Sequence, residues 1–313
     1  MNKLWLATFH LNPDLAKKLI ETQFPELHSV TLEFIGEGWD NVVYRVNHDY
    51  VFRFPRRQLG ADLVDTEWKI LPHLIGLLPL PIPEPLFYGK PTSEFPWHFL
   101  GYRFLQGQSA CAARLSIDER IKLAKPLAQF LKALHAIDQA QALSFGAQRD
   151  DIGKLDDMGK LDVEKRWPVA LQNIEKIREL GLFDQCDALV ALLHDLKDVR
   201  DTGPKTLIHS DLYARHLLVD EHRALSGVID WGDIRIANPA TDLVILFSFL
   251  PKSAHHVFLD EYGPIDEQTR QLALMRELYH SSAIVLYSHE IGDKDLLDES
   301  LFGLHLLVQH CPT

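Results

Sequence analysis

One stretch of the chain, residues 207–242, places histidine and carboxylate side chains where they could act on a bound ligand. His209, Asp211 and His216 lie between two short hydrophobic runs, so a loop joining the runs would carry all three. A carboxylate in such a loop can take a proton from a hydroxyl group, and an imidazole five residues later can bind a metal ion. Asp230 ends the apolar run GVID, so its carboxylate would emerge from a strand into a loop. The pattern indicates proton transfer beside a metal site.

Short strands within a helical region would hold these residues. TLIHSDL, HLLVD and LSGVID are apolar runs typical of strands, and DEHRA between the last two is turn-like. Upstream, Ser116 and Glu119 have the spacing of a capping box, which predicts the start of a helix. Pro126 should either kink this helix or mark its first turns. Further helices are predicted near residues 163–180 and 184–198 and beyond residue 241, and the charged residues 148–166 are expected to form an exposed loop.

The first third of the chain predicts a small sheet. VTLEFI, NVVYRV and YVFRF in residues 30–54 read as a meander of three strands, and residues 61–78 have the apolar spacing of one amphipathic helix. The proline-rich LPLPIPEP must end that helix, and PLFYG and residues 97–107 supply two more strands. We therefore expect an α+β fold with a boundary near residue 106.

Composition excludes several classes of protein. A chain of 313 residues with 46% hydrophobic content can bury a large core, and three distant cysteines without CxxC spacing predict neither disulfides nor zinc but a cytoplasmic protein. The formal charge of −12 argues against nucleic acid as a partner. The N-terminal residues form neither a signal peptide nor a membrane span, so no membrane partner is expected.

The order of these motifs resembles the aminoglycoside and macrolide phosphotransferases, which are relatives of the protein kinases. Their pattern, HxDxxxxN or HxDxxxxH followed by IDxxD, is similar to HSDLYARH at 209–216 and IDWGD at 229–233. In having histidine at the last position of the first motif, His216, the chain is similar to the 2″-aminoglycoside and macrolide kinases. The resemblance covers about residues 30–260. It implies a bilobal protein-kinase-like fold with a nucleotide-binding lobe in residues 1–105 and a catalytic, substrate-binding lobe in residues 106–313.

The resemblance implies a role for each motif residue. Asp211 would be the catalytic base, while Asp230 and His216 would bind Mg²⁺, with His216 as a second-rank ligand because nitrogen is a less usual partner for this ion. His209 would support the loop by hydrogen bonding. Asp242 is expected to be structural, as an orienting or capping residue.

The nucleotide site is implied in the same way. Gly36 and Gly38 lie where a kinase has its glycine-rich loop, although a GxG can equally be a hairpin turn. Arg53 takes the place of the lysine that holds the α- and β-phosphates, and Glu67 takes the place of its glutamate partner. Arginine for lysine is the main departure from the family pattern. The alternative for Arg53 is a surface arginine on an edge strand, and the alternative for Glu67 is an ordinary exposed residue of a helix.

Two further assignments rest on the resemblance alone. Arg103 and Leu105 would offer backbone groups to the purine, although these residues could equally form an edge strand. Arg56 or Arg57 could share phosphate binding with Arg53.

The expected reaction moves the γ-phosphate of ATP or GTP, with Mg²⁺, to a hydroxyl of a small molecule. An aminoglycoside or macrolide antibiotic is the first expectation, and a metabolite alcohol of the choline, homoserine or sugar type is the alternative. A nucleotide-binding pseudokinase scaffold is a third hypothesis, because of Arg53. The helix after Asp242 reads LVILFSFLPKSAHH and lacks the carboxylates that a polycationic aminoglycoside would need. Its apolar side chains fit a macrolide-like alcohol or a buried core.

Overall fold

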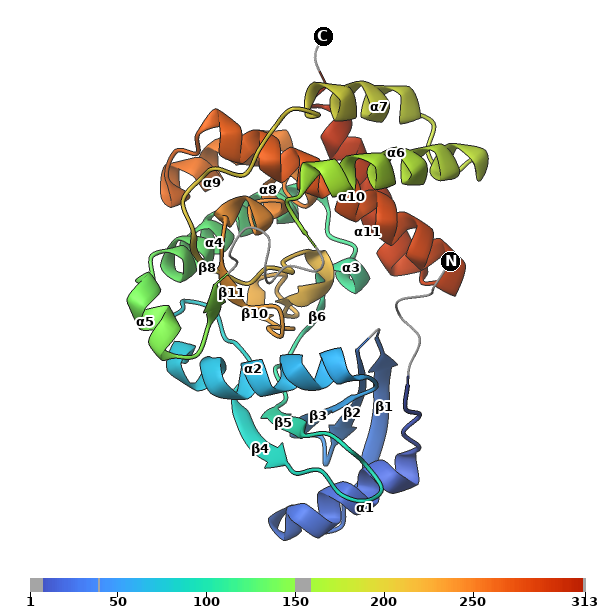
Figure 1. The fold of residues 1–313 in the computed structure, drawn as a ribbon, viewed down its shortest axis with the longest axis vertical. Helices are drawn as coiled ribbons and strands as arrows, with labels where there is room; N and C mark the ends of the chain where they lie inside the picture. Colours follow the sequence, from blue (N-terminus) through green and yellow to red (C-terminus); the bar gives the residue numbers. More distant parts are fainter. Residues whose placement is uncertain (1–7, 39, 150–158, 312–313) are drawn as a thin grey trace. The chain divides into compact units, whose positions relative to one another are not determined.

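The computed structural model describes residues 8–38, 40–149 and 159–311, so most of the predicted charged loop lies outside the described residues. Contacts divide the chain into two compact units. As far as their residues are described, the first comprises Met1–Leu77, Pro81–Leu105 and Asp230–Ile234, and the second comprises Leu78–Leu80, Gln106–Ile229 and Arg235–Thr313. Figure 1 shows a sheet with helices in the first unit and mainly helices in the second.

The first unit is built on an antiparallel sheet of the five strands that the sequence predicted, and their order in the sheet is β1-β2-β3-β5-β4. The β-branched and aromatic residues of these segments favour extended backbone. The strands are β1 (Leu32–Glu37), β2 (Asn41–Val46), β3 (Tyr50–Pro55), β4 (Pro85–Gly89) and β5 (Phe99–Arg103).

Strand β3 is central and has two different faces. Because successive side chains of a strand point to opposite faces, Phe52 and Phe54 lie on one face and Arg53 on the other. Both phenylalanines are fully buried in an aromatic cluster with Phe99, whose ring stacks on Phe54 at 4.7 Å between centroids. The opposite face carries Arg53 toward α2 (Gln58–Leu74), the predicted amphipathic helix. Arg53 is therefore not on an edge strand.

A helix that the sequence analysis did not predict, α1 (Pro13–Gln23), packs into the same aromatic core. Its signals are local: the Asn12 side chain accepts the N–H of Leu15, and Pro13 occupies the first helical position. Its buried residues, Ala16, Leu19 and Ile20, have the spacing of one helical face. This pattern was available in the sequence but is only three turns long.

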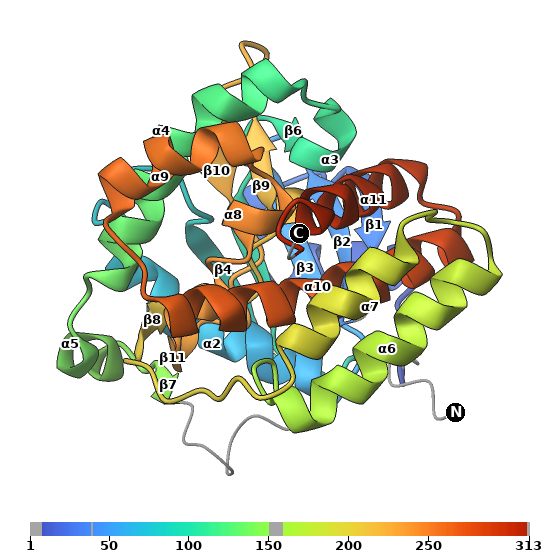
Figure 2. The ribbon, with the colours of Figure 1, turned by 90° about the horizontal axis from the view of Figure 1, so that it is seen from above.

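The second unit is organised around one long helix, α10 (Glu267–Ile291), which packs against α6 and α11 (Figure 2). Side chains on all of its faces are buried, which is typical of a helix inside a core. The other helices of four or more residues are α3 (Ala110–Ala113), α4 (Ile117–His135), α5 (Gln139–Ser144), α6 (Val163–Glu179), α7 (Cys186–Asp195), α8 (Ile245–Ser248), α9 (His255–Tyr262) and α11 (Lys294–Val308).

Two small sheets in the second unit carry the predicted catalytic loop. β8 (Thr206–Ile208) enters the loop and pairs with β11 (Arg235–Ala237), which also pairs with β7 (Gln148–Arg149). β9 (Leu217–Val219) leaves the loop and pairs with β10 (Leu225–Val228) and β6 (Gln108–Ser109). The strand before Asp230 thus ends at Val228, two residues earlier than predicted.

Helix α4 begins as predicted, with a capping box in which the Ser116 and Glu119 side chains each bond the other residue's backbone. Pro126 lies within this helix, which continues through it. In the described part of the chain, no helix is long and apolar enough to cross a membrane.

Candidate active site

A buried carboxylate from outside the loop holds the start of the predicted catalytic loop. Asp242 accepts the backbone N–H groups of His209 and Ser210, both at 2.7 Å, and bonds Nε2 of His135 at 3.2 Å. Burial alone would raise the pKa of Asp242, but the bond and charge of His135, together with His209, bring the net pKa below its ordinary value. Asp242 is therefore an ionised anchor, consistent with the structural role expected for it.

The backbone of this loop is strained next to the predicted base. Ser210 has φ of +73°, a left-handed conformation that is uncommon outside glycine and costs about 1–2 kcal/mol. The Asp242 bonds hold its N–H, and Nζ of Lys160 donates to its carbonyl at 3.0 Å. The strained residue directly precedes Asp211, so these contacts fix the path of the backbone that leads into the predicted base.

His209 connects the loop to the strand that leads to Asp230. Burial lowers the pKa of His209, so the ring is neutral. Its Nδ1 accepts the N–H of Asp211 at 3.3 Å, and its Nε2 donates to the carbonyl of Ile229 at 3.0 Å. The Ile229 N–H donates to the carbonyl of His216 at 2.9 Å. Both histidines are therefore hydrogen-bonded to Ile229, the residue directly before Asp230.

The contacts of His216 fix its tautomer. Its Nδ1 lies 2.8 Å from the carbonyl oxygen of Asp211, and because a carbonyl only accepts, Nδ1 donates. In the neutral ring the lone pair is then on Nε2, the form that a metal ligand requires. His216 is buried, whereas the Asp211 side chain is 29% exposed and can meet a ligand.

In the first unit, Arg53 joins two carboxylates. Its Nη1 donates to Oε1 of Glu67 at 2.6 Å, and its Nη2 donates to Oδ1 of Asp230 at 2.7 Å. The hydroxyl of Tyr102 donates to the other carboxylate oxygen of Glu67. Burial alone would lower the pKa of Arg53, but Asp230 and Glu67 raise it well above its ordinary value. The arginine thus takes the predicted place beside its glutamate, and Glu67 is buried rather than exposed.

The two neighbouring arginines hold the glycine-rich loop. Nη1 of Arg56 donates to the carbonyl of Gly38 at 2.6 Å, and Nε of Arg57 donates to Asp40 at 2.5 Å. Phosphate binding by Arg56 or Arg57 stays a prediction.

Neither glycine of the loop is required by its own surroundings. A Cβ added at Gly36 would meet nothing within 4 Å, and one added at Gly38 would come no closer than 3.9 Å to the carbonyl oxygen of Asn41. Both φ angles lie outside the left-handed region. A ligand that approaches the backbone closely would give the missing reason for glycine.

The two residues predicted to contact the purine lie at the end of the sheet. Arg103 is the last residue of β5, and Leu105 follows two positions later. Between them, the N–H of Phe104 donates to the carbonyl of Asp49 at 2.7 Å, which fixes the path of the backbone from Arg103 to Leu105. Their contacts with a purine stay a prediction.

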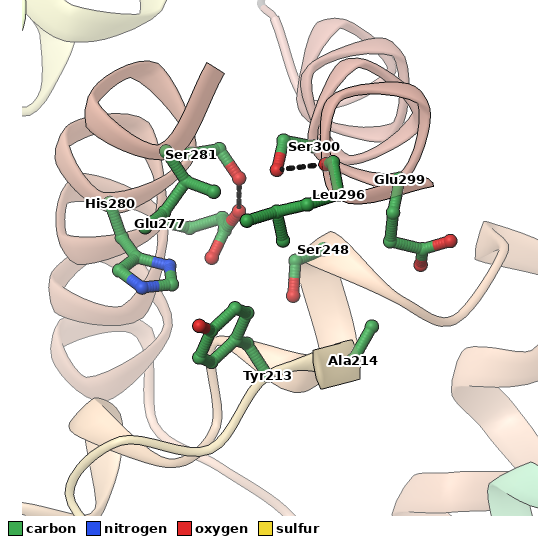
Figure 3. Close-up of a pocket in the computed structure, with 10 residues that line it drawn as sticks. Tyr213, Ala214, Ser248, Glu277, His280, Ser281, Leu296, Glu299 and Ser300 are labelled. Atoms are coloured by element: carbon green, nitrogen blue, oxygen red, sulfur yellow. Dashed lines mark hydrogen bonds between the residues drawn. The ribbon is translucent and has the colours of Figure 1, made fainter. Parts of the chain in front are cut away.

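A small internal cavity follows the loop (Figure 3). Its volume is ≈ 20 Å³, room for about one water molecule, so it cannot hold an acceptor. Glu277 of α10 accepts a bond from Ser281, while its Oε2 has no hydrogen-bond partner among the described residues. Burial raises the pKa of Glu277 to about 8. The lining residues are Tyr213, Ala214, Ser248, Glu277, His280, Ser281, Ile284, Leu296, Glu299 and Ser300.

Replacing this glutamate should change how stability depends on pH. The folded-state pKa of Glu277, about 8, exceeds the ordinary value of 4.5, so the folded protein binds more protons than the unfolded chain between these values. This contribution to stability is present below pH 4.5 and is lost as pH rises through 8, in total on the order of 5 kcal/mol. Glu277→Gln should flatten that decline in thermal unfolding measured from pH 5 to 9. Glu164→Gln, at an 80% exposed side chain, is the control, and equal slopes in wild type and Glu277→Gln would contradict the assignment.

Two loop contacts had no signal in the sequence. His135 lies 107 positions from Asp242, and Lys160 lies 50 positions from Ser210. Neither belongs to a motif, and both positions read as ordinary polar residues of a helix and a loop. Only a three-dimensional arrangement brings them to the loop.

The fold and these residues define a class. A five-stranded antiparallel sheet with an Arg–Glu pair, in a chain that also carries a mainly helical unit with a histidine–aspartate loop, is the architecture of a protein-kinase-like phosphotransferase. A family model of the phosphotransferase enzyme family matches residues 31–278, and the chain belongs to this family. The predicted fold class and the predicted enzyme class, a small-molecule kinase, are confirmed.

Solved structures of similar proteins agree with the assignment, and one curated protein is also similar to this chain. The GDP complex of aminoglycoside 2′-phosphotransferase-IIIa is 28% identical, covers 96% of this chain and 98% of its own, and has a TM-score of 0.67. The GDP and kanamycin complex of APH(2″)-IIIa is also 28% identical, with 94% and 97% covered and a TM-score of 0.66. Macrolide 2′-phosphotransferase type I, at 19% identity with 94% and 97% covered and a TM-score of 0.58, shares the fold. The uncharacterized protein YcbJ of Bacillus subtilis (strain 168) is 24% identical over 244 residues, 72% of this chain and 73% of its own.

Proposed function

We propose that the chain transfers the γ-phosphate of ATP or GTP to a hydroxyl group of a small molecule. The observation that carries the proposal is the contact of Arg53 with the buried Glu67 and with Asp230, in the unit that also holds the glycine-rich loop. A kinase needs a cation of this kind for the α- and β-phosphates. Solved structures of similar proteins contain GDP or ATP, which supports a nucleotide as co-substrate.

In this proposal the first unit binds the nucleotide. The loop at Gly36 and Gly38 approaches the phosphates, Arg53 holds them, and the backbone at Arg103 and Leu105 contacts the purine. Glu67 keeps the arginine in place, because the glutamate is fixed from its other side by Tyr102.

The second unit supplies the base in this proposal. Asp211 accepts a hydrogen bond from the acceptor hydroxyl and takes its proton as the bond to phosphorus forms. The Asp211 side chain is exposed enough to contact a ligand. The hydrogen bond from the strained Ser210 to Asp242 holds the loop in place. Retention of this base argues against a pseudokinase scaffold.

The donor set fits Mg²⁺ that arrives with the nucleotide. Mg²⁺ is usually bound by one or two carboxylates together with substrate phosphates and water. Among the described residues, no group of three or more His, Cys, Asp or Glu could hold a metal ion by itself. Asp230 would bind the ion as a carboxylate, and His216 would serve through Nε2. When bound, Mg²⁺ would neutralise charge on the phosphates.

Two classes of acceptor remain in this proposal. Aminoglycoside and macrolide antibiotics come first, because similar proteins carry these names. A metabolite alcohol is the second candidate, because the stretch after Asp242 lacks the carboxylates that a polycationic aminoglycoside would need.

Turnover of ATP and GTP by the purified protein with Mg²⁺ tests the proposal. Aminoglycosides, macrolides and metabolite alcohols are offered in separate reactions, and phosphorylated product is identified by mass spectrometry. We expect one class of acceptor to stimulate turnover and to be phosphorylated on a hydroxyl. Tight nucleotide binding without phosphorylation of any acceptor, in the same preparation, would favour the scaffold hypothesis instead.

A further inference from the structure

Three helices of the second unit bring serine side chains to the small cavity of Figure 3. Ser248 lies on α8, Ser281 on α10 and Ser300 on α11, and these three helices pack against one another. All three side chains line the cavity, together with the carboxyl group of Glu277. Ser281, Ser300 and Glu277 are buried. Polar side chains between packed helices are unfavourable unless their hydrogen bonds are completed, so this convergence needs an explanation.

The hydroxyl protons of the three serines are already used in other bonds. Ser248 and Ser300 donate to the backbone carbonyls four positions earlier, at 3.1 and 2.8 Å. Ser281 donates to Oε1 of Glu277. A hydroxyl oxygen that has donated its proton still has lone pairs that accept a hydrogen bond. The three serines can therefore offer acceptors, but not donors, to a ligand in the cavity.

Glu277 supplies the donor. Its side chain is fully buried, and burial raises its pKa to about 8, so the carboxyl group is mostly protonated at neutral pH. Oε1 accepts the bond from Ser281, whereas Oε2 is buried and has no hydrogen-bond partner among the described residues. The proton therefore belongs on Oε2, the oxygen that does not already accept a bond. A buried donor without a partner is destabilising, so a ligand that accepts from Oε2 would stabilise the fold.

The size and the polarity of the cavity together define what can bind there. Its volume is ≈ 20 Å³, enough for one water molecule and too little for an organic ligand. Apolar cavities stay dry, whereas a polar cavity of this size holds an ordered water if two to four groups can bond it. Water can accept from Oε2 of Glu277 and donate its two protons to serine hydroxyls. It then makes three hydrogen bonds, the usual number for a buried water.

We propose that this cavity is a specific site for one structural water molecule, which accepts from Glu277 and donates to the hydroxyls of Ser248 and Ser300. Ser281 already bonds the same carboxyl group directly, so the other two serines are the acceptors of the water. The water thus joins α10 to α8 and α11. It lies against Tyr213 and Ala214, shortly after Asp211 in the chain, and belongs to the packing around the proposed catalytic loop. The inference goes beyond the proposed kinase function and does not depend on it.

A shared water molecule would couple two serines that lie on different helices. Ser248→Ala and Ser300→Ala should each lower the unfolding temperature by about 2–4 °C, the shift that the loss of one buried hydrogen bond produces. The double variant should lose about as much as the more damaging single variant, because the first change already releases the water.

Ser288→Ala is the matched control for these variants. Ser288 is fully buried on α10 and donates to the carbonyl of Ile284 at 2.7 Å, but it is not one of the described residues that line the cavity. Its shift in unfolding temperature should add in full to that of Ser300→Ala.

The water can also be detected directly. Magnetic relaxation dispersion of isotope-labelled water counts the molecules that are held inside a protein. Glu277→Met removes the donor and should lower the count by one relative to wild type. Glu277→Gln should keep the water, because its amide oxygen can accept from Ser281 while its N–H donates, as the protonated carboxyl does. If Glu277→Met does not fold, the double serine variant replaces it and should lose the same water.

Either fully additive shifts for Ser248→Ala and Ser300→Ala or equal water counts in wild type and Glu277→Met would overturn the inference. Stabilisation by sodium chloride that tetramethylammonium chloride does not reproduce, and that Glu277→Gln abolishes, would also overturn it. The occupant would then be a small cation held by an ionised Glu277. A crystal structure should show density for one water within hydrogen-bond distance of Oε2, the result that we expect.

Discussion

Asp211→Asn is expected to lower kcat for phosphoryl transfer by about 10²- to 10⁴-fold, the range that a positioned general base contributes. Asparagine keeps the shape of the side chain but cannot take the proton of the acceptor hydroxyl. KM for the nucleotide should change little, because the proposed nucleotide contacts come from other residues. Product formation under saturating nucleotide and acceptor measures the effect.

The matched control is Asp187→Asn, which removes a carboxylate that is 99% exposed on α7. It should leave kcat unchanged. The unfolding temperature of Asp211→Asn should also stay close to that of wild type, since the hydrogen bonds from this loop to Asp242 and Ile229 come from other groups. Wild-type turnover in Asp211→Asn would remove this residue from the role of base.

Arg53→Met is expected to lower kcat/KM for the nucleotide by about 10²- to 10³-fold, the effect of losing one preorganised charge at the reacting group. The side chain that would hold the α- and β-phosphates is lost. Glu67 is also left buried without its cation, a change that typically destabilises by about 3–5 kcal/mol. Kinetics well below the unfolding temperature and calorimetric nucleotide binding separate the two effects.

Arg53→Lys distinguishes charge from geometry at this position. Lysine restores the residue of the family pattern, but its single ammonium cannot reproduce the fork that contacts Glu67 and Asp230 with separate nitrogens. We expect activity between those of wild type and Arg53→Met. Lys69→Met on the exposed face of α2 should be neutral. A kcat/KM of Arg53→Met within threefold of wild type would show that phosphate binding depends on other residues.

Much of the architecture could be predicted because its signals are local. The strand runs in residues 30–54 alternate or cluster apolar residues, and the capping box at Ser116 requires only a spacing of three. The Arg53–Glu67 pair was predicted through the resemblance, and the structure places the two side chains in contact. Strand and helix bounds shifted by a few residues, since end residues depend on tertiary contacts.

Contacts between distant residues could not be predicted. His135 and Tyr262 meet across 127 positions and position Asp242, yet each reads as an unremarkable helix residue in the sequence. Packing of this kind depends on the whole fold and leaves no local pattern.

The bond between Arg53 and Asp230 has a consequence for how the enzyme responds to its ligands. The carboxylate proposed for Mg²⁺ has a counter-ion of its own, supplied by the side chain proposed for the phosphates. Mg²⁺ alone must compete with Arg53 for the carboxylate of Asp230. A complex of metal and nucleotide gives both side chains new partners at the same time, the metal for Asp230 and the phosphates for Arg53. Binding of the two should therefore be mutually reinforcing, a thermodynamic coupling in which each ligand removes an obstacle to the other. An ion pair between the two side chains proposed to bind these ligands would thus make the protein respond to the complex of metal and nucleotide rather than to either component.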